Sequence, residues 1–576
     1  MHRNIASSRP PHPRIAARPT PPDPFTVRLP YAPGYTIGEL LALARDRYDY
    51  IIVGAGSAGC VLANRLSADP QCQVLLLEAG PADRNPFIHM PAGLARLVNN
   101  RRINWNLDTE PEPALDGRRL WWPRGKVLGG SSAINAMCYI RGVPADYDGW
   151  AAAGATGWEW AQVLPWFLHG EANSRGASAL HGDAGPLSVS DLRHHNPLSA
   201  VFLAAAVQAG HAPNDDFNGV HQLGVGLYQV TQRDGARCSS ATAYLRPARA
   251  RRNLTVLTGA QAVALSFVGT TATGVHYRRG REHRHATASA EVILSAGAIH
   301  SPQLLMLSGI GPAHALRGHG ITPRVDLPGV GGNLQDHLDI CTVVHTHPGV
   351  SYDRSNELRI AIDYFLRGHR GAGTSNLAEA GGFARSALAP DARADVQFHF
   401  VPAMLDKHGR HRLPGDGYTL HACPLHPRSR GRLYLRDADA RSPPRLQPNY
   451  LGDADGHDLR MMIECARLSR QILAQPAFDP WRGAPVFPAH DDLDDAALAA
   501  FIRAKAETIY HPVGTCAMGQ HADAVVDPML RVYGTQRLRV VDAAVMPSLI
   551  SGNTNAPTLM IAERAAQWLR QDAGSR

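Results

Sequence analysis

The sequence predicts an α/β fold organised around a dinucleotide-binding βαβ unit near its N-terminus. The strand-like run 48–53 leads into the turn Gly54-Ala55-Gly56-Ser57-Ala58-Gly59, and the helix-like run 60–66 follows at once. A second apolar run, 73–77, ends at Glu78, roughly twenty residues past the turn, where a carboxylate can accept hydrogen bonds from a ribose 2′-hydroxyl. This order of strand, glycine turn, helix and acidic residue is typical of a unit that binds NAD or FAD.

Each position of the glycine turn has a separate physical task. Gly54 allows the tight turn, Gly56 lets the backbone approach a pyrophosphate, and Gly59 lets the helix pack on the strand. The helix start at Ser57 and Ala58 offers free N–H groups and a positive dipole end to the phosphates. These five positions are therefore candidate cofactor contacts, and they leave NAD and FAD open.

Length and composition limit the remaining possibilities. A chain of 576 residues predicts about two to four domains or one discontinuous pair. It contains no run of about eighteen apolar residues, so we expect no transmembrane helix and leave peripheral membrane contact open. The net charge of +8 is dispersed and carried mainly by arginine, which reads as a coding bias; we expect no nucleic-acid partner.

The cysteines, histidines and N-terminal residues carry no further motif. The 8 cysteines form no CxxC pair, which predicts reduced thiols and a cytoplasmic protein. The pairs His194-His195 and His283-Arg284-His285 come without HExxH or a matching Cys and His set, so we expect no metal site. Residues 1–45 are expected to be a disordered leader, with a misassigned start or a transit-type address as alternatives.

Two longer motifs resemble those of a known family. The segment 125–142 contains two glycines followed by two serines, which suit a helix N-terminus close to a flat or anionic group. This segment resembles the first signature of the glucose-methanol-choline (GMC) flavin oxidoreductases, and the segment 297–311 resembles the second. The resemblance extends from Tyr48 to about Leu569, which is nearly the whole chain.

The resemblance implies a Rossmann-like FAD-binding domain with a discontinuous α+β substrate-binding domain that forms a lid. Strand-like runs at 253–257 and 291–295 agree with a sheet to which the chain returns. The expected FAD-binding segments are 46–145, 225–340 and 500–572, and the expected substrate-binding segments are 146–224 and 341–499.

The resemblance also implies that the cofactor is FAD. We expect noncovalent FAD, because Ile134 stands where some relatives carry the histidine that attaches the flavin. The helix after Pro557 would point its N-terminus at the flavin ring and stabilise the negative charge that develops on reduction. The implied contacts beyond the glycine turn are Gly129, Gly130, Ser132, Asn135, Ala136, Val263, Asp542, Ala543, Asn555 and Thr558.

The catalytic candidates follow from the same resemblance. His511, in the element His-Pro-Val-Gly-Thr, matches the catalytic histidine, and Asn553 matches the His or Asn that pairs with it. Imidazole suits the removal of a proton near neutral pH. His511 would accept the alcohol proton, Asn553 would donate a hydrogen bond to the forming alkoxide, and the hydride would pass to flavin N5. We therefore expect oxidation of an alcohol, preferably a primary one, to an aldehyde.

Several alternatives stay open at this stage. Asp339 stands where choline-oxidising relatives carry a glutamate that meets the trimethylammonium group, so choline dehydrogenase or oxidase is the first alternative. Tyr510 is a further substrate candidate. A hydroxynitrile lyase and a fatty-acid photodecarboxylase are less favoured; Cys423 lies near the cysteine of the latter branch, but that branch lacks His511. A non-enzymatic flavoprotein is the remaining alternative. The electron acceptor can be a quinone, an electron carrier or oxygen, and we favour an acceptor other than oxygen.

Overall fold

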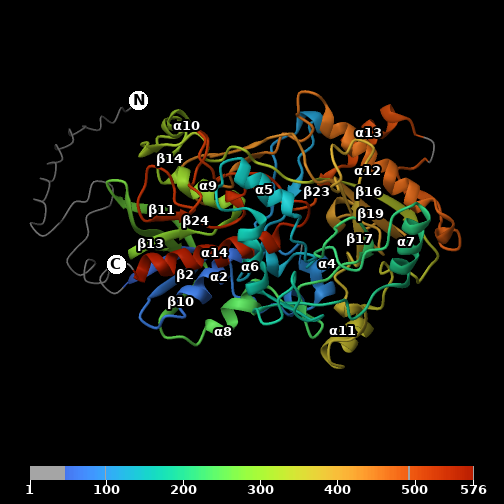
Figure 1. Ribbon diagram of the computed structural model, residues 1–576, viewed down its shortest axis with the longest axis horizontal. Coiled ribbons are helices and arrows are strands. Elements are labelled where there is room, and N and C mark those ends of the chain that lie inside the picture. Colours follow the sequence, from blue (N-terminus) through green and yellow to red (C-terminus); the bar gives the residue numbers. More distant parts are fainter. Residues whose placement is uncertain (1–45, 98, 491–492, 575–576) are drawn as a thin grey trace, which may run out of the picture. The chain divides into compact units, whose positions relative to one another are not determined.

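The computed structural model describes residues 46–97, 99–490 and 493–574. The leader expected over residues 1–45 lies outside the described residues. Within residues 48–574, two seven-stranded sheets carry most of the regular structure (Figure 1).

The first sheet combines strands from distant parts of the chain. Its order is β10 (Leu254–Thr258), β2 (Val74–Glu78), β1 (Arg47–Val53), β13 (Glu282–Leu294), β12 (Thr271–Arg279) and β11 (Ala260–Val268), with β24 (Leu538–Val540) beside β13. β1, β2 and β10 are parallel, β24 runs parallel to β13, and β11 to β13 form an antiparallel meander. The order β10-β2-β1 confirms the predicted Rossmann-like nucleotide-binding fold, and β10 and β13 confirm the two predicted returning strands.

Two helices from opposite ends of the described chain cover part of this sheet. α2 (Ser57–Leu66) follows β1 after the glycine turn, and α14 (Asn555–Gly574) packs against α2 (Figure 1). β2 is buried along its whole length, as expected for a parallel strand covered on both faces. The hydroxyl of Tyr50 in β1 donates a hydrogen bond to the carbonyl of Leu569 in α14, at 3.0 Å. The C-terminal helix α14 therefore packs beside α2 and contacts strand β1.

The second sheet is antiparallel throughout. Its order is β22 (Pro485–Phe487), β16 (Leu338–His345), β19 (Gly417–Pro424), β18 (Val396–Val401), β17 (Ala380–Ala384) and β7 (Gly224–Leu227), with β23 (Glu507–Thr508) beside β16. α12 (His457–Leu473) and α13 (Asp495–Lys505) pack on β16, and α7 (Pro197–Gln208) packs on β7 and β17 (Figure 1). Strand β7 extends across the domain boundary expected at 224/225, and β16 extends across the one expected at 340/341. The sequence did not reveal this, because local sequence does not show which strands will pair.

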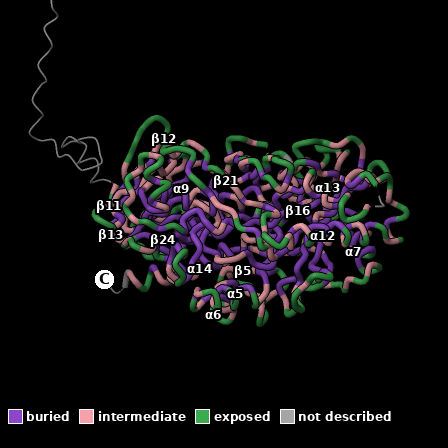
Figure 2. The backbone as a smooth tube through the Cα atoms, turned by 90° about the horizontal axis from the view of Figure 1, so that it is seen from above, coloured by how far each residue is buried: buried purple, intermediate pink, exposed green. Residues whose placement is uncertain are grey.

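The remaining helices lie around the two sheets. They are α3 (Pro86–His89), α4 (Leu94–Leu97), α5 (Pro144–Ala152), α6 (Trp160–Gly170), α8 (Arg246–Ala248), α9 (Gly297–Leu307), α10 (Ala313–Gly318) and α11 (Glu357–Phe365). In Figure 2, many residues of α14 and of the region around β16 are buried. Among the described residues, no helix combines the length and the apolar character that crossing a bilayer requires.

Candidate active site

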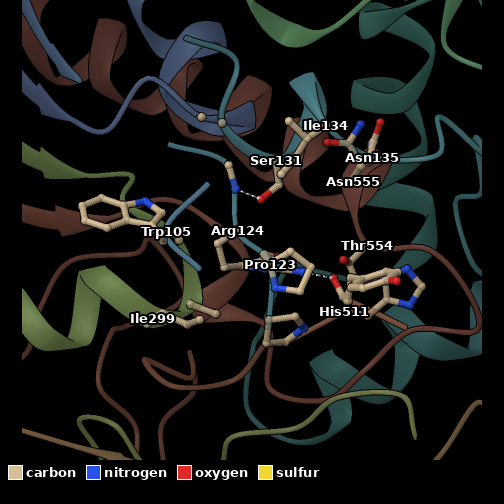
Figure 3. A pocket seen from close by; sticks show the side chains of 18 of the residues that line it. Trp105, Pro123, Arg124, Ser131, Ile134, Asn135, Ile299, His511, Thr554 and Asn555 are labelled. Atoms are coloured by element: carbon tan, nitrogen blue, oxygen red, sulfur yellow. Dashed lines mark hydrogen bonds between the residues drawn. The ribbon is translucent and has the colours of Figure 1, made fainter. Parts of the chain in front are cut away.

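A cavity of about 420 Å³ is lined by residues from both sheets. Gly54 and Glu78 come from the first sheet and its glycine turn, and Asp339 and His421 come from the second. Figure 3 shows Trp105 and Ile299 on one side of the cavity and His511 and Thr554 on the other. A volume of this size is typical of a site for a cofactor or another small molecule.

The glycine turn forms a cradle with open space at its centre. Gly54 has φ +100°, and a Cβ added there would lie 2.4 Å from the carbonyl oxygen of Ser295. A Cβ added at Gly59 would lie 1.9 Å from the carbonyl oxygen of Gly54, so strand and helix touch at this point. An added Cβ at Gly56 meets nothing closer than 3.9 Å. Bare backbone beside open cavity at a helix N-terminus fits a bound phosphate.

Three helices begin at this cavity. Ser57 of α2, Gly297 of α9 and Asn555 of α14 all line it. The hydroxyl of Ser57 donates a hydrogen bond to Oδ1 of Asn555 at 2.7 Å, which ties two of these helix starts together. Each start presents the positive end of a helix dipole, and at α9 the N–H of Gly297 already donates to Oδ2 of Asp542 at 2.8 Å. The arrangement fits an anionic pyrophosphate and a ring that gains negative charge.

Two buried carboxylates hold loops in the cavity wall. Glu78 accepts hydrogen bonds from the N–H groups of Ala55 at 3.0 Å and Gly80 at 2.7 Å. Burial raises the pKa of Glu78 to about 7. Asp542 accepts a hydrogen bond from the hydroxyl of Ser301 at 2.6 Å, and burial raises its pKa. Each carboxylate retains lone pairs that can accept hydrogen bonds from hydroxyl groups of a ligand.

Most of the cofactor residues predicted from the sequence line the cavity. They are Gly54, Gly56, Ser57, Ala58, Glu78, Gly130, Asn135, Ala136, Asp542, Ala543, Asn555 and Thr558. Gly59, Gly129, Ser132 and Val263 are not among the lining residues. The Ser132 hydroxyl bonds to the Gly129 carbonyl at 2.6 Å, and Val263 lies at a register shift of β11. Ala262, its neighbour, reaches the cavity instead.

His511 and Asn553 face each other at the other end of the cavity. Nδ2 of Asn553 lies 3.2 Å from Nε2 of His511, although the residues are 42 positions apart. Oδ1 of Asn553 accepts a hydrogen bond from Nε2 of Gln397 on β18, at 2.9 Å. This second contact directs the amide nitrogen of Asn553 towards the imidazole. Nothing in the sequence around Gln397 indicated this role, because only the strand pairing brings it to the site.

A second histidine fixes the tautomer of His511. Nε2 of His337 lies 2.9 Å from the carbonyl oxygen of Leu425, which can only accept, so this nitrogen carries a proton. Burial lowers the pKa of His337 to about 4, so its ring is neutral at pH 7 and its Nδ1 is an acceptor. Nδ1 of His511 lies 3.0 Å from that Nδ1 and must donate to it. The lone pair of His511 is therefore on Nε2, beside Asn553.

The backbone and charge state of His511 are also controlled. Its N–H donates to Oδ1 of Asp336 at 2.7 Å. The preceding Tyr510 has φ +74°, a strained value for a non-glycine residue, and its carbonyl accepts from Arg124 at 2.8 Å. Burial, and then the neighbouring His337, His399 and Arg124, lower the pKa of His511 well below its usual value. The imidazole is therefore neutral near pH 7.

The remaining candidates occupy different places. Oδ2 of Asp339 accepts a hydrogen bond from Nδ1 of His421 at 2.6 Å. The hydroxyl of Tyr510 bonds to His408, and both line the cavity. Cys423 is buried in β19 and is not among the lining residues. Ile134 lines the cavity with an aliphatic side chain that cannot form a bond to flavin.

Comparisons with known proteins agree on one family. Two family models, both described as GMC oxidoreductase, match residues 48–339 and 427–562. An alcohol dehydrogenase [acceptor] of Pseudomonas putida is 50% identical over 527 residues, which cover 90% of this chain and 95% of the relative. The mitochondrial choline dehydrogenase of Homo sapiens is 46% identical over 542 residues, which cover 92% of this chain and 90% of the relative. A solved formate oxidase from Aspergillus oryzae, studied for modification of its FAD, has a TM-score of 0.85 with 26% identity, covering 92% of this chain and 99% of that chain.

Proposed function

The chain belongs to the GMC oxidoreductase family and binds FAD, and from this premise we propose that it oxidises a neutral primary alcohol to an aldehyde. The observation that carries the proposal is the pairing of His511 Nε2 with Asn553 Nδ2 at 3.2 Å in the cavity wall. A hydroxyl group that lies within hydrogen-bond distance of both atoms can donate to the imidazole while it accepts from the amide.

We assign the proton chemistry to His511 and Asn553. The neutral ring of His511 accepts the hydroxyl proton at Nε2, because its Nδ1 is already bound to His337. Asn553 donates a hydrogen bond to the oxygen on which negative charge develops, and Gln397 keeps its amide in this orientation. The contacts of His337 with His511, of His511 with Asn553, and of Gln397 with Asn553 therefore orient a proton acceptor and a hydrogen-bond donor towards one substrate oxygen.

The cofactor residues described above suit FAD in noncovalent form. The glycine turn and the start of α2 would hold the pyrophosphate, and Glu78 would accept from the ribose. The starts of α9 and α14 would lie near the flavin portion, and Ile134 would leave it unattached. When bound, FAD supplies the acceptor for the hydride of the carbinol carbon.

A neutral alcohol is favoured over choline by the aromatic residues of the cavity. Quaternary ammonium groups are usually bound by several aromatic faces. Among the described lining residues, the Phe, Trp and Tyr side chains are Trp105, Phe487 and Tyr510. The ammonium of Lys126 lies 4.3 Å from the ring of Trp105, and that of Lys505 lies 3.7 Å from the ring of Phe487. Both rings already face a cation, so a cage for choline is incomplete.

Asp339 supports the same choice. Its side chain is 3% exposed, and its Oδ2 already contacts His421 at 2.6 Å. The thiol of Cys341 donates to the same oxygen at 3.5 Å. Oδ2 of this carboxylate is therefore already engaged, and only Oδ1 is left to meet a trimethylammonium group. Choline oxidation remains the second candidate, because a choline dehydrogenase is 46% identical to this chain.

The electron acceptor and the domain division are further parts of the proposal. We favour an acceptor other than oxygen, and the 50% identical relative is named an alcohol dehydrogenase [acceptor]. The FAD-binding segments 46–145, 225–340 and 500–572 contribute the strands of the first sheet, which supports the main part of that division, whereas β23 and parts of β7 and β16 from the same segments belong to the second sheet. All the cysteines are free thiols, which supports a cytoplasmic location.

An anaerobic substrate panel tests the proposal. Purified holoenzyme is mixed with short, long, aromatic and quaternary-ammonium alcohols, and the loss of flavin absorbance is followed. We expect rapid bleaching with a neutral primary alcohol and slow bleaching with choline. Subsequent addition of a quinone or of air identifies the acceptor. Faster reduction by choline than by every neutral alcohol would reverse the order of the two candidates, and no reduction by any alcohol would refute alcohol oxidation.

A further inference from the structure

Three potential metal ligands meet on the cavity face of the second sheet. Asp339 and Cys341 stand two residues apart on β16, so their side chains share one face of the sheet. His421 on β19 is the direct cross-strand partner of Cys341. All three residues line the cavity, and their ligand atoms lie within 4.8 Å of one another. The sequence showed no metal motif, because 80 positions separate the cysteine from the histidine.

The distances within this cluster are close to those of a coordinated ion. Tetrahedral Zn²⁺ with bonds of about 2.0–2.3 Å separates sulfur from nitrogen or oxygen by about 3.5 Å, and nitrogen from oxygen by about 3.3 Å. The thiol of Cys341 lies 3.3 Å from Nδ1 of His421 and 3.5 Å from Oδ2 of Asp339. The contact between Asp339 and His421, at 2.6 Å, must open by about 0.7 Å. One short side-chain movement therefore makes room for the ion.

The buried carboxylate has an unused atom. Asp339 is 3% exposed, and its Oδ1 has no hydrogen-bond partner among the described residues. A buried carboxylate oxygen without a partner is costly, because it has left water and gained no donor. A cation bound by this carboxylate compensates its charge, whether it contacts one oxygen or both.

We propose that Asp339, Cys341 and His421 form a site for one Zn²⁺ ion in the wall of the substrate cavity. Thiolate, imidazole and carboxylate are the ligands that zinc prefers, whereas Mg²⁺ and Ca²⁺ prefer oxygen ligands alone. Binding releases the thiol proton of Cys341 to solvent, and the proton on Nδ1 of His421 moves by exchange with solvent to Nε2, which leaves the Nδ1 lone pair for the ion. Three protein ligands leave the fourth tetrahedral position for a water molecule or another small ligand.

The ion inhibits the oxidation of the alcohol. It lies in the wall of the cavity that also holds His511 and Asn553, so the ion and its fourth ligand occupy space that a substrate needs. Zinc therefore competes with the alcohol and takes no part in the chemistry assigned to His511. This inference concerns a second ligand of the cavity and is separate from the identity of the alcohol.

Calorimetric titration of the holoenzyme tests the site without substrate. The protein is first treated with a chelator and then titrated with Zn²⁺ or, separately, with Mg²⁺. We expect one Zn²⁺ per chain and no detectable Mg²⁺. Cys341→Ser and His421→Asn should each weaken zinc binding at least about tenfold. Cys138→Ser is the matched control, because Cys138 also lines the cavity but is not part of the cluster, and it should bind zinc like the parent.

Two results would overturn the proposal. One is the absence of stoichiometric Zn²⁺ binding in the parent holoenzyme, which needs no variant. The other is zinc binding that both ligand variants retain at parental affinity, since the ion would then be elsewhere.

Inhibition by Zn²⁺ should also be relieved by raising the alcohol concentration, and it should be lost in Cys341→Ser relative to the uninhibited rate of that variant. Inhibition that no alcohol concentration relieves would contradict competition in the cavity.

Discussion

At the scale of single residues, His511 is the group whose loss should affect the chemistry most. Its Nε2 is the neutral proton acceptor beside Asn553, while the phosphate cradle lies on other segments. We expect His511→Ala to slow anaerobic flavin reduction by an alcohol about 10²- to 10⁴-fold, with FAD content unchanged. Stopped-flow absorbance measures the rate. His283→Ala, at an exposed position of β13, is the control and should react like the parent.

His337 should act as a positioning residue rather than as a structural one. His337→Leu removes the acceptor for Nδ1–H of His511, so the imidazole can turn or change tautomer. We expect the rate constant for flavin reduction to fall about 10- to 100-fold with little change in KM. His337→Gln can accept from His511 and donate to Leu425, and it should restore part of the rate. Equal losses in both variants, matched by equal losses of thermal stability, would indicate a packing role only.

The pH dependence of the reaction should report the lowered pKa of His511. The base works when it is unprotonated, so activity is present above its pKa and is lost as the pH falls through it. Burial and the nearby His337, His399 and Arg124 keep that pKa well below 6.5. We therefore expect kcat/KM for the alcohol to stay constant from pH 8 to below about 6.5, the usual histidine value. A half-maximal point at 6.5 in steady-state profiles would contradict a buried, neutral base.

The sequence located these side chains only in part. His511 and Asn553 were predicted from motifs, and the structure places them in hydrogen-bond distance. Gln397 and the contact of His337 with His511 depend on strand pairing and on the path of the chain, which local sequence does not contain. The grouping of Cys341 with His421 has the same origin, because a cross-strand partner is set by register.

At the scale of secondary-structure elements, two glycines of the turn between β1 and α2 have different roles: Gly59 is needed for folding and Gly56 for cofactor binding. A Cβ at Gly59 would lie 1.9 Å from the Gly54 carbonyl oxygen, so Gly59→Ala should destabilise the FAD-free protein by about 1–3 kcal/mol. A Cβ at Gly56 meets no protein atom within 3.9 Å. Gly56→Ala should therefore leave the unfolding temperature of the FAD-free protein unchanged. It should lower the affinity for FAD about tenfold or more, which corresponds to at least about 1.4 kcal/mol of binding free energy. Thermal unfolding and FAD titration of both variants measure the two effects.

The opposite pattern would contradict this division. If Gly56→Ala destabilised the FAD-free protein as much as Gly59→Ala, the space beside Gly56 would be needed for folding. If Gly56→Ala bound FAD like the parent, the phosphate would not approach this backbone.

The sequence predicted the strands and helix of this unit because their signals are local. The glycine turn and the apolar runs at 48–53 and 73–77 identify β1, α2 and β2 without reference to the rest of the chain. The place of β24 beside β13, and of β23 beside β16, follows from contacts between distant segments. Two-residue and three-residue strands such as these carry too few residues for a period of two to be recognised.

At the scale of the whole molecule, an ion pair joins helices from the two ends of the described fold. Nε and Nη2 of Arg65 on α2 each donate to Glu563 on α14 at 2.8 Å, and the two residues are 498 positions apart. The side chain of Glu563 is 2% exposed, and each of its two carboxylate oxygens accepts a hydrogen bond from Arg65. Both helices start at the cavity, at Ser57 and Asn555. The pair therefore fixes the relative position of two helix N-termini that we assign to the cofactor.

Breaking this pair should weaken folding and cofactor binding together. Arg65→Met leaves the Glu563 carboxylate without its bidentate partner, at an expected cost of about 3–5 kcal/mol. Replacing both residues, with Arg65→Met and Glu563→Leu, removes the unpaired charge and should recover most of the stability and of the FAD affinity. Thermal unfolding at a fixed scan rate and FAD titration of the parent, the single variant and the double variant measure both quantities. If Arg65→Met lost stability but bound FAD like the parent, the spacing of α2 and α14 would not control the cofactor site.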